Sequence, residues 1–320
     1  MTSRRWLSLL TALLVCSLLA VSVSVSLRGV PVAEASQQPS PGNNVPSFDS
    51  NRAWEHLRHQ VSLGPRPAGS AALNSARRYI IEQLEKAGIQ TRQQIFIART
   101  PLGEMSMGNV IATIPGRRRE RIILGSHFDT KRASDFRFVG ANDGASSTAV
   151  LLELGRVLKP RTHEFTIELL FLDGEEAVNW EWGTTGADNT YGSRHYVDAA
   201  RKAGTLADIK AFVLLDMVGD RNLVLRRDQQ STRWLVDAIW STAAMLGHGA
   251  VFSNEPTEVE DDHISFLRAG VPSVDLIDLE YPQWHTAQDD LDHVSARSLQ
   301  VVGDVVVASL PAIAKRAAQP

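Results

Sequence analysis

Two adjacent glutamates, Glu175 and Glu176, are the residues of this sequence best placed to do chemistry. They lie in the string DGEEA, directly after the apolar run FTIELLFL. Two charges at the end of a buried strand are costly unless a cation compensates them. One carboxylate can bind a metal ion while its neighbour accepts a proton from the reacting group. The pair therefore predicts metal-assisted acid–base chemistry.

Four other stretches carry side chains of metal-binding types, each beside an apolar segment. His127 and Asp129 close RIILGSHFD, Asp143 follows VGAN, Asp216 ends AFVLLD, and His285 follows YPQW. Taken singly, each has a structural explanation, since aspartates suit turns and helix N-caps. Taken together, two histidines and several carboxylates without a thiol predict a zinc site with nitrogen and oxygen ligands. Thr286 and the acidic run QDDLD offer acceptors for the second ring nitrogen of His285.

The segments that must position these side chains alternate between strand-like and helix-like patterns. Strands are predicted at 109–114, 121–126, 165–172, 211–218 and 271–278, and helices at 75–88, 145–158, 191–204, 234–247 and 298–316. This alternation predicts an α/β fold, a single domain with a mostly parallel central sheet flanked by helices on both faces. Such sheets carry their sites at the carboxyl ends of the strands, where the candidate residues fall.

The N-terminal segment has the pattern of an export signal. Arg4 and Arg5 precede an uncharged stretch at 6–27 that is long enough to span a bilayer, and Ala-Glu-Ala at 33–35 fits a cleavage site. A cleaved signal peptide and an uncleaved membrane anchor both fit residues 1–35. Because the arginines hold the N-terminal end in the cytoplasm, the rest is expected to be exported, either secreted or periplasmic or tethered to the membrane.

Composition narrows the class of protein and the extent of its folded part. Residues 36–51 are rich in Ser, Gln, Pro, Gly and Asn and predict a flexible linker, which leaves 52–316 as the catalytic domain. The only cysteine, Cys16, lies in the apolar segment, so the exported part is expected to have no disulfide. The 43% apolar content suffices for a large core, and a net charge of −3 argues against a nucleic-acid partner.

Other catalytic classes lack their sequence signatures. No GxSxG elbow of a serine hydrolase, no GxGxxG of a dinucleotide site and no HExxH helix of a thermolysin-like protease is present. A catalytically silent receptor or adhesion domain would need no zinc, and the complete ligand set disfavours it.

The motifs resemble those of the M28 clan of zinc aminopeptidases and, within it, the glutaminyl cyclase branch. The resemblance covers nearly the whole exported domain, in the segments LGPRPAGS (63–70), SHFDTK (126–131), FVGANDGAS (138–146), FLDGEEA (171–177), YGSRH (191–195), LLDMVGD (214–220), EDDHISFLRAGVP (260–272) and WHT (284–286). The metal motifs are common to the clan. YGSRH and EDDHISFL favour the cyclase branch.

The resemblance implies a role for each matching residue. It makes Asp143, Glu176 and His285 the ligands of one zinc ion and Glu175 the general base and acid. The implied reaction converts the N-terminal glutamine of a peptide or protein substrate into pyroglutamate and releases ammonia.

The same resemblance implies roles for three further residues. Asp216 and Asp261 are implied to form a hydrogen-bonded carboxylate network with the reacting nitrogens, and Trp284 to form a wall of the substrate pocket. The alternative is an M28-type aminopeptidase that removes N-terminal residues, in which His127 and Asp216 would hold a second zinc.

Two positions depart from the animal-type cyclases. Asp275 stands where those enzymes have histidine, and Gly144 where serine is expected. The segment after the glutamates is longer than its counterpart, which leaves open whether Trp180 or Trp182 lines the pocket.

Overall fold

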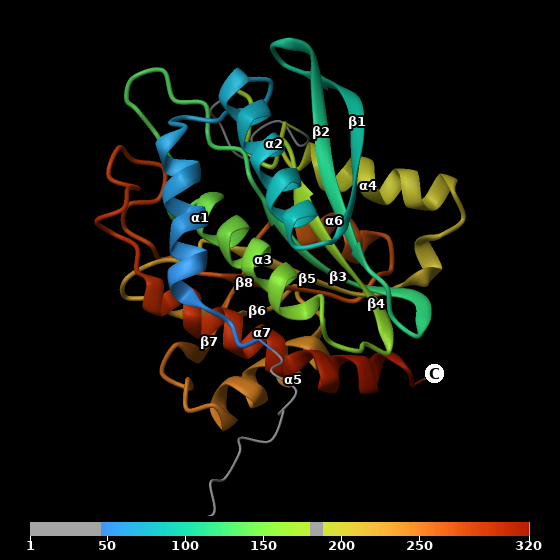
Figure 1. Ribbon diagram of the computed structural model, residues 1–320. Helices are drawn as coiled ribbons and strands as arrows, with labels where there is room; N and C mark the ends of the chain where they lie inside the picture. The colour runs from blue at the N-terminus through green and yellow to red at the C-terminus, as the bar shows by residue number, and fades with distance from the viewer. Residues whose placement is uncertain (1–45, 180–187, 320) are drawn as a thin grey trace, which may run out of the picture. The chain divides into compact units, whose positions relative to one another are not determined.

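A six-stranded sheet forms the centre of the protein in this computed structural model, which describes residues 46–179 and 188–319 (Figure 1). The strand order is β1-β2-β4-β3-β5-β8, with bounds β1 (Gln90–Thr100), β2 (Gly103–Ile114), β3 (Arg118–His127), β4 (Phe165–Leu172), β5 (Ile209–Asp216) and β8 (Ser273–Ile277). Strands β4, β3, β5 and β8 are parallel, whereas β2 is antiparallel to both β1 and β4. Two short strands, β6 (Leu225–Asp228) and β7 (Phe252–Thr257), pair separately.

Helices pack on both faces of the sheet. One face carries α1 (Ser50–Ser62), α2 (Ala71–Lys86), α3 (Ala145–Leu158), α5 (Arg233–Met245) and α7 (Ala296–Ala317). The other carries α4 (Tyr191–Lys202) and α6 (Asp262–Arg268), with the short 3-10 helix η1 (Leu206–Asp208) beside it. The predicted α/β architecture is confirmed.

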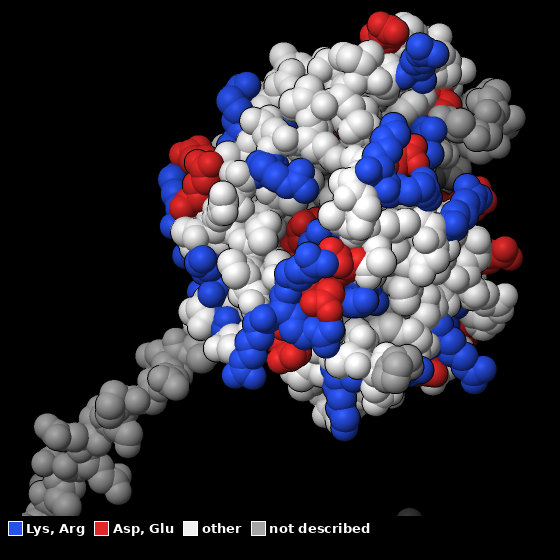
Figure 2. Space-filling view, turned by 90° about the vertical axis from the view of Figure 1, so that its right-hand side faces the viewer, with Lys and Arg blue, Asp and Glu red and all other residues white. Residues whose placement is uncertain are grey.

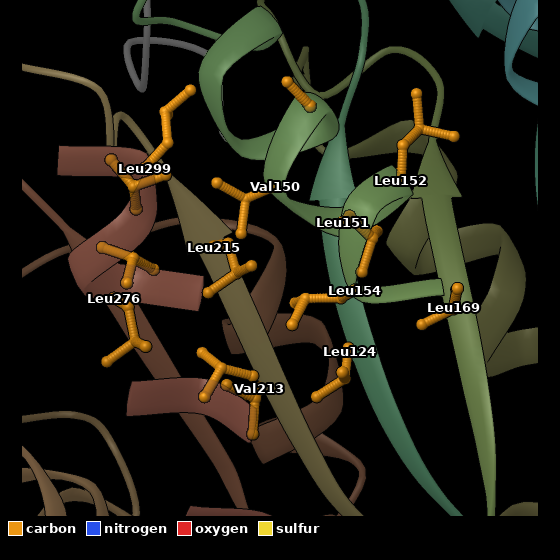
Figure 3. Packing of buried hydrophobic residues seen from close by; sticks show 14 of the residues in the cluster. Leu124, Val150, Leu151, Leu152, Leu154, Leu169, Val213, Leu215, Leu276 and Leu299 are labelled. Atoms are coloured by element: carbon orange, nitrogen blue, oxygen red, sulfur yellow. The ribbon is translucent and has the colours of Figure 1, made fainter. Parts of the chain in front are cut away.

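The central strands are apolar throughout because both of their faces are buried. Neighbouring residues of β3 show this, since Leu124 packs under α3 while Ile123 faces the opposite cluster under α4 and α6. Figure 3 shows the larger cluster, in which Leu151 and Leu154 of α3 meet Leu124, Leu169 and Val213 of the sheet. This core holds the carboxyl ends of the parallel strands side by side.

Most predicted elements occur at or close to their expected bounds. The strand at 165–172 and the helix at 145–158 match β4 and α3 residue for residue. The helix predicted at 75–88 begins earlier, at Ala71, because Ser70 caps it through Leu73 N–H. Strand β1 and helix α1 were not predicted.

The folded part begins before Arg52. Phe48 is buried against Gly303 of α7, and Asp49 caps α1 while its own N–H donates to Glu153 Oε1 at 3.0 Å. The backbone carbonyls of Pro46 and Ser47 accept hydrogen bonds from Arg161 and Arg156, at the C-terminal end of α3. The predicted N-terminal segment 1–35 and most of the linker lie outside the described residues.

Helix α7 is the one described helix that is long and apolar enough to cross a membrane. More than half of its most apolar window, 56%, is buried inside the protein, and it packs on α1, α3 and α5. A core helix passes the same test of length and composition, so α7 is explained by its packing. The expected tether through residues 6–27 lies outside the described range.

His56 gives the fold a dependence on pH. Burial, followed by the charge of Arg52, lowers its pKa to about 4, and its Nδ1 lies 2.8 Å from the hydroxyl of Tyr79. Since the unfolded chain takes up this proton near pH 6.5, the stability contributed by neutral His56 is complete above that pH and is lost as the pH falls towards 4. The free energy of unfolding of the wild type should therefore fall between about pH 7 and about pH 5. We expect His56→Gln to make this fall smaller by on the order of 1 kcal/mol, measured by urea unfolding at both pH values. An unchanged difference would contradict this assignment.

Candidate metal centre and active-site pocket

The candidate residues meet at the carboxyl edge of the parallel strands. His127 ends β3, Glu175 and Glu176 follow β4, and Asp216 ends β5. Asp143 lies in the turn before α3, and His285 lies in the loop after β8. Parallel neighbours bring these strand ends together, as predicted.

The metal-type side chains form two triads that share Asp143. In the first triad, His127 Nε2 lies 3.2 Å from Asp143 Oδ1 and 3.0 Å from Asp216 Oδ1. In the second, His285 Nε2 lies 3.4 Å from both Asp143 Oδ2 and Glu176 Oε2. Each triad places three potential ligand atoms within 4.8 Å of one another. The two carboxylate oxygens of Asp143 therefore point to different triads.

Buried carboxylates hold the loops that carry these ligands. Asp129 accepts hydrogen bonds from the backbone N–H groups of Glu175 and Glu176, both at 3.2 Å. Asp289 accepts from the N–H of Asn142 at 2.7 Å and from that of Asp143 at 3.1 Å. Asp289 belongs to the acidic run that was expected to offer acceptors to His285. It accepts instead from these backbone amides and from the Tyr281 hydroxyl at 3.1 Å.

Gly144 is required where it stands. Its φ of 84° favours glycine, and a Cβ there would lie 2.6 Å from the carbonyl oxygen of Asp129 and 3.0 Å from the His127 ring. A serine at this position would disturb the first triad. The departure from the animal-type sequence thus has a local steric reason.

A fully buried guanidinium lies beneath the turn that carries Asp143. Arg66 donates to the carbonyl oxygens of Gln60, Gly64 and Val139 at 2.8–3.2 Å, and to that of Gly140 at 3.3 Å. The negative charges of Asp289, Asp129 and Asp143 favour its charged form against the cost of burial. Arg66 therefore both braces the turn and offsets part of the negative charge of the site.

Several carboxylates are buried close together in the site, and this shifts the pKa values of the site residues. Burial raises the pKa of Glu175 well above its usual range and that of Glu176 to about 7. Although burial opposes a charge on the histidines, nearby carboxylates raise the pKa of His285 to about 9 and that of His127 well above 6.5. The raised pKa values of these side chains favour protonated forms, which limit the repulsion between carboxylates. A bound cation would take the place of those protons.

Unpartnered atoms support the same conclusion. His127 Nδ1, Asp143 Oδ2 and both carboxylate oxygens of Glu176 are buried and have no hydrogen-bond partner among the described residues. Buried polar atoms without partners are rare in proteins and need an explanation such as an ion. The donor set, nitrogen and carboxylate oxygen without sulfur, fits a divalent metal such as zinc.

A pocket of about 160 Å³ opens above the two triads. Its floor is formed by five buried acids that include Asp216 and Asp261, and its apolar wall by Met217, Ile277 and Trp284 among others. Trp284 stacks on His285 with 4.2 Å between ring centroids. The residues predicted for catalysis, for the single zinc ion and for substrate binding thus line one cavity. His127, a predicted ligand of a second zinc, is not among the lining residues, and Trp180 and Trp182 lie outside the described range.

Some features of the site were not predicted. The segment from Asp261 to His263 begins α6, and Asp262, buried like its neighbours, has no hydrogen-bond partner for either carboxylate oxygen among the described residues. Asp275 lies 3.6 Å from His263 Nδ1, so a histidine of α6 faces the position at which the animal-type cyclases carry their own histidine. The run EDDH in the sequence could have indicated this cluster. No feature of the sequence indicated that His263 would face Asp275 of β8.

One face of the protein carries side chains of both charges. Figure 2 shows lysine and arginine side chains interleaved with aspartate and glutamate on the side that lies to the right in Figure 1. That face carries no continuous basic field of the kind that binds nucleic acid.

Comparison with known proteins places this geometry in a family. Residues 109–310 match the model of peptidase family M28. The glutaminyl-peptide cyclotransferase of Boiga irregularis is 30% identical over 296 residues, which cover 80% of this chain and 79% of that protein. A solved glutaminyl cyclase from an Acidobacteriales bacterium is 37% identical, with a TM-score of 0.80 over 88% of this chain and 100% of that one. A Zn-dependent exopeptidase from Parabacteroides distasonis is 28% identical, with a TM-score of 0.75 over 84% of this chain and 99% of that one. The chain therefore belongs to peptidase family M28 and, within it, to the glutaminyl-peptide cyclotransferases.

Proposed function

We propose that the protein is a zinc-dependent glutaminyl cyclase, which converts the N-terminal glutamine of peptides into pyroglutamate with release of ammonia. The observation that carries the proposal is the position of Glu175. This carboxylate lines the pocket beside the triad Asp143, Glu176 and His285 but belongs to neither triad, so it is free to move protons. The similarity to named cyclases supplies the substrate class.

The reaction is intramolecular and needs no external nucleophile. The α-amine of the substrate attacks the carbon of its own γ-carboxamide, forms the ring C–N bond and expels ammonia. Zinc held by Asp143, Glu176 and His285 would supply Lewis-acid polarisation of the carboxamide. Glu175 accepts the proton that the amine loses and delivers one to the departing nitrogen.

The other pocket residues hold the substrate. Burial, followed by the charge of Asp216, raises the pKa of Asp261 to about 8, so this side chain can keep a proton and share it with a substrate nitrogen. Asp216 lines the same floor and completes the carboxylate network. Trp284, 40% exposed, offers the ring face against which the glutamine side chain packs. With these residues the pocket orients the amine towards the γ-carbon, which lowers the entropic cost of ring closure.

A second candidate function is removal of the N-terminal residue by an M28-type aminopeptidase. The observation that favours it is the intact first triad, in which His127, Asp143 and Asp216 can hold a second metal ion. In that reaction Glu175 would activate water, and peptide-bond cleavage would replace cyclisation.

Mass spectrometry of a peptide that begins with glutamine separates the two. The full chain is loaded with zinc, incubated with the peptide and compared with a reaction that lacks enzyme. Loss of ammonia with every residue retained, above the spontaneous rate, is the result expected of a cyclase. Release of free glutamine would overturn the proposal in favour of the aminopeptidase.

We also propose that the protein acts outside the cytoplasm, after export directed by residues 1–35, either released or tethered through residues 6–27. The basis is the arginine-preceded apolar stretch of the sequence. Fractionation of cells that express the full chain, with N-terminal sequencing of the product, tests this. Recovery from the cytoplasm with an intact N-terminus would contradict it.

A further inference from the structure

The mouth of the active-site pocket carries charges that the proposed chemistry does not use. Of the thirteen residues that line the pocket, seven are Asp or Glu, one is His and none is Lys or Arg. Five of the acids are buried at the floor, but Glu258 and Glu260 are exposed. These two lie in the segment between β7 and α6, which leads directly into the buried Asp261.

The mouth of the pocket also carries exposed apolar side chains. Leu279 is 37% exposed and Trp284 40% exposed, which makes them two of the few large hydrophobic side chains on the described surface. Leu279 and Trp284 line the same pocket as the two glutamates, so a side chain that reaches out of the pocket can contact both kinds of residue.

Neighbouring cations do not cancel the charge of the mouth. Arg268 Nη2 lies 3.6 Å from Glu260 Oε1, but both side chains are largely exposed, at 75% and 64%, so water screens the pair. No described residue forms an ion pair with Glu258. At the floor, Asp261 Oδ2 is buried without a hydrogen-bond partner among the described residues, so the acidic segment ends at an unpaired polar atom that lines the pocket.

We propose that Glu258 and Glu260 form a subsite for a positively charged side chain that follows the N-terminal glutamine, and that Leu279 and Trp284 contact its aliphatic stem. The inference rests on the proposed function, because the substrate glutamine must fill the floor for the next residues to reach the mouth. Lysine and arginine match the subsite, since each combines an apolar stem with a charged head. The substrate class is therefore peptides that begin with glutamine followed closely by a basic residue.

The expected preference is moderate. An exposed ion pair is worth about 0.2–1 kcal/mol, which corresponds to roughly 1.4- to 5-fold in kcat/KM for each glutamate. Since the charged residue binds away from the reacting atoms, the preference should lie in KM and leave kcat nearly unchanged. Salt should weaken it because the mouth is open to solvent.

Three peptides that differ only in their second residue, lysine, alanine or glutamate after an N-terminal glutamine, test the proposal with the full zinc-loaded chain. We expect kcat/KM to fall in the order Lys, Ala, Glu, with a ratio of about fivefold or more between the extremes at low salt that shrinks at about 0.5 M salt. The double variant Glu258→Gln, Glu260→Gln should bring the ratio close to one and leave the alanine peptide unaffected. Glu255→Gln is the matched control, because Glu255 is exposed on β7 but does not line the pocket.

Equal kcat/KM for the three peptides, or a lysine preference that survives the double variant, would overturn the subsite alone. Absence of turnover of all three peptides would overturn the proposed function together with the subsite. The two failures are thus distinguishable.

Discussion

Replacement of Glu175 by glutamine is expected to reduce turnover of a glutamine peptide by at least about 100-fold while the protein keeps its metal. The amide has the shape of the carboxylate but cannot accept a proton at neutral pH. Because burial already favours the neutral form of Glu175, the substitution should cost little stability. The measurement is kcat from ammonia release, together with the zinc content of the purified protein.

The neighbouring residue gives the matched control. Glu176 has the same side chain and a similar degree of burial, but it belongs to the second triad. Glu176→Gln should therefore lose activity together with metal, whereas Glu175→Gln should lose activity alone. If Glu175→Gln retained wild-type kcat, its proposed role as proton acceptor would be wrong.

Asp143→Asn is expected to weaken metal binding more than substitution of any other single ligand, because Asp143 is the only described residue common to both triads. An amide keeps one oxygen but removes the negative charge that faces His127 at 3.2 Å and His285 at 3.4 Å. Loss of even an outer partner of a metal ligand costs about 10–100-fold in affinity, so loss of the shared carboxylate should exceed that range. Competition with a chromogenic chelator measures the change.

Two further variants separate the triads. Asp216→Asn alters only the triad of His127, and Glu176→Gln only the triad of His285. If the wild type binds one zinc through the second triad, Asp216→Asn should keep its zinc content, and Glu176→Gln should lose it. Zinc affinity unchanged in Asp143→Asn would rule out both sites as assigned.

Glu175, Glu176 and Asp216 could be singled out from the sequence because each lies at the end of a strongly apolar segment, whereas the ligand roles of Asp143 and His285 were implied by the resemblance to the M28 clan. In β4, the apolar run FTIELLFL predicts that the next charged residues lie at the carboxyl end of the strand, and the parallel arrangement brings them close to the ends of the neighbouring strands. No contact needed to be known in advance for Glu175, Glu176 and Asp216 to be grouped.

The supporting residues could not be predicted in the same way. Asp289 reaches the backbone of Asp143 across 146 residues of sequence, and Arg66 bonds to carbonyl oxygens, which carry no sequence signal. Strand β1 was missed because its glutamines and arginines have weak strand propensity, and it is stabilised by pairing with β2 along its whole length. Such features depend on tertiary contacts that become visible only once the chain is folded.

The anchoring of Pro46 and Ser47 has a consequence for how the enzyme can be attached to other structures. Their hydrogen bonds lie at the C-terminal end of α3, whereas Asp143 precedes the N-terminal end of that helix, roughly 20 Å away by helix length. A force applied to the N-terminal end of the domain acts first on the hydrogen bonds donated by Arg156 and Arg161. It does not act directly on the catalytic loops. A fusion partner, a solid support or a lipid layer joined ahead of Pro46 would thus hold the domain by the end of α3 remote from its reactive centre.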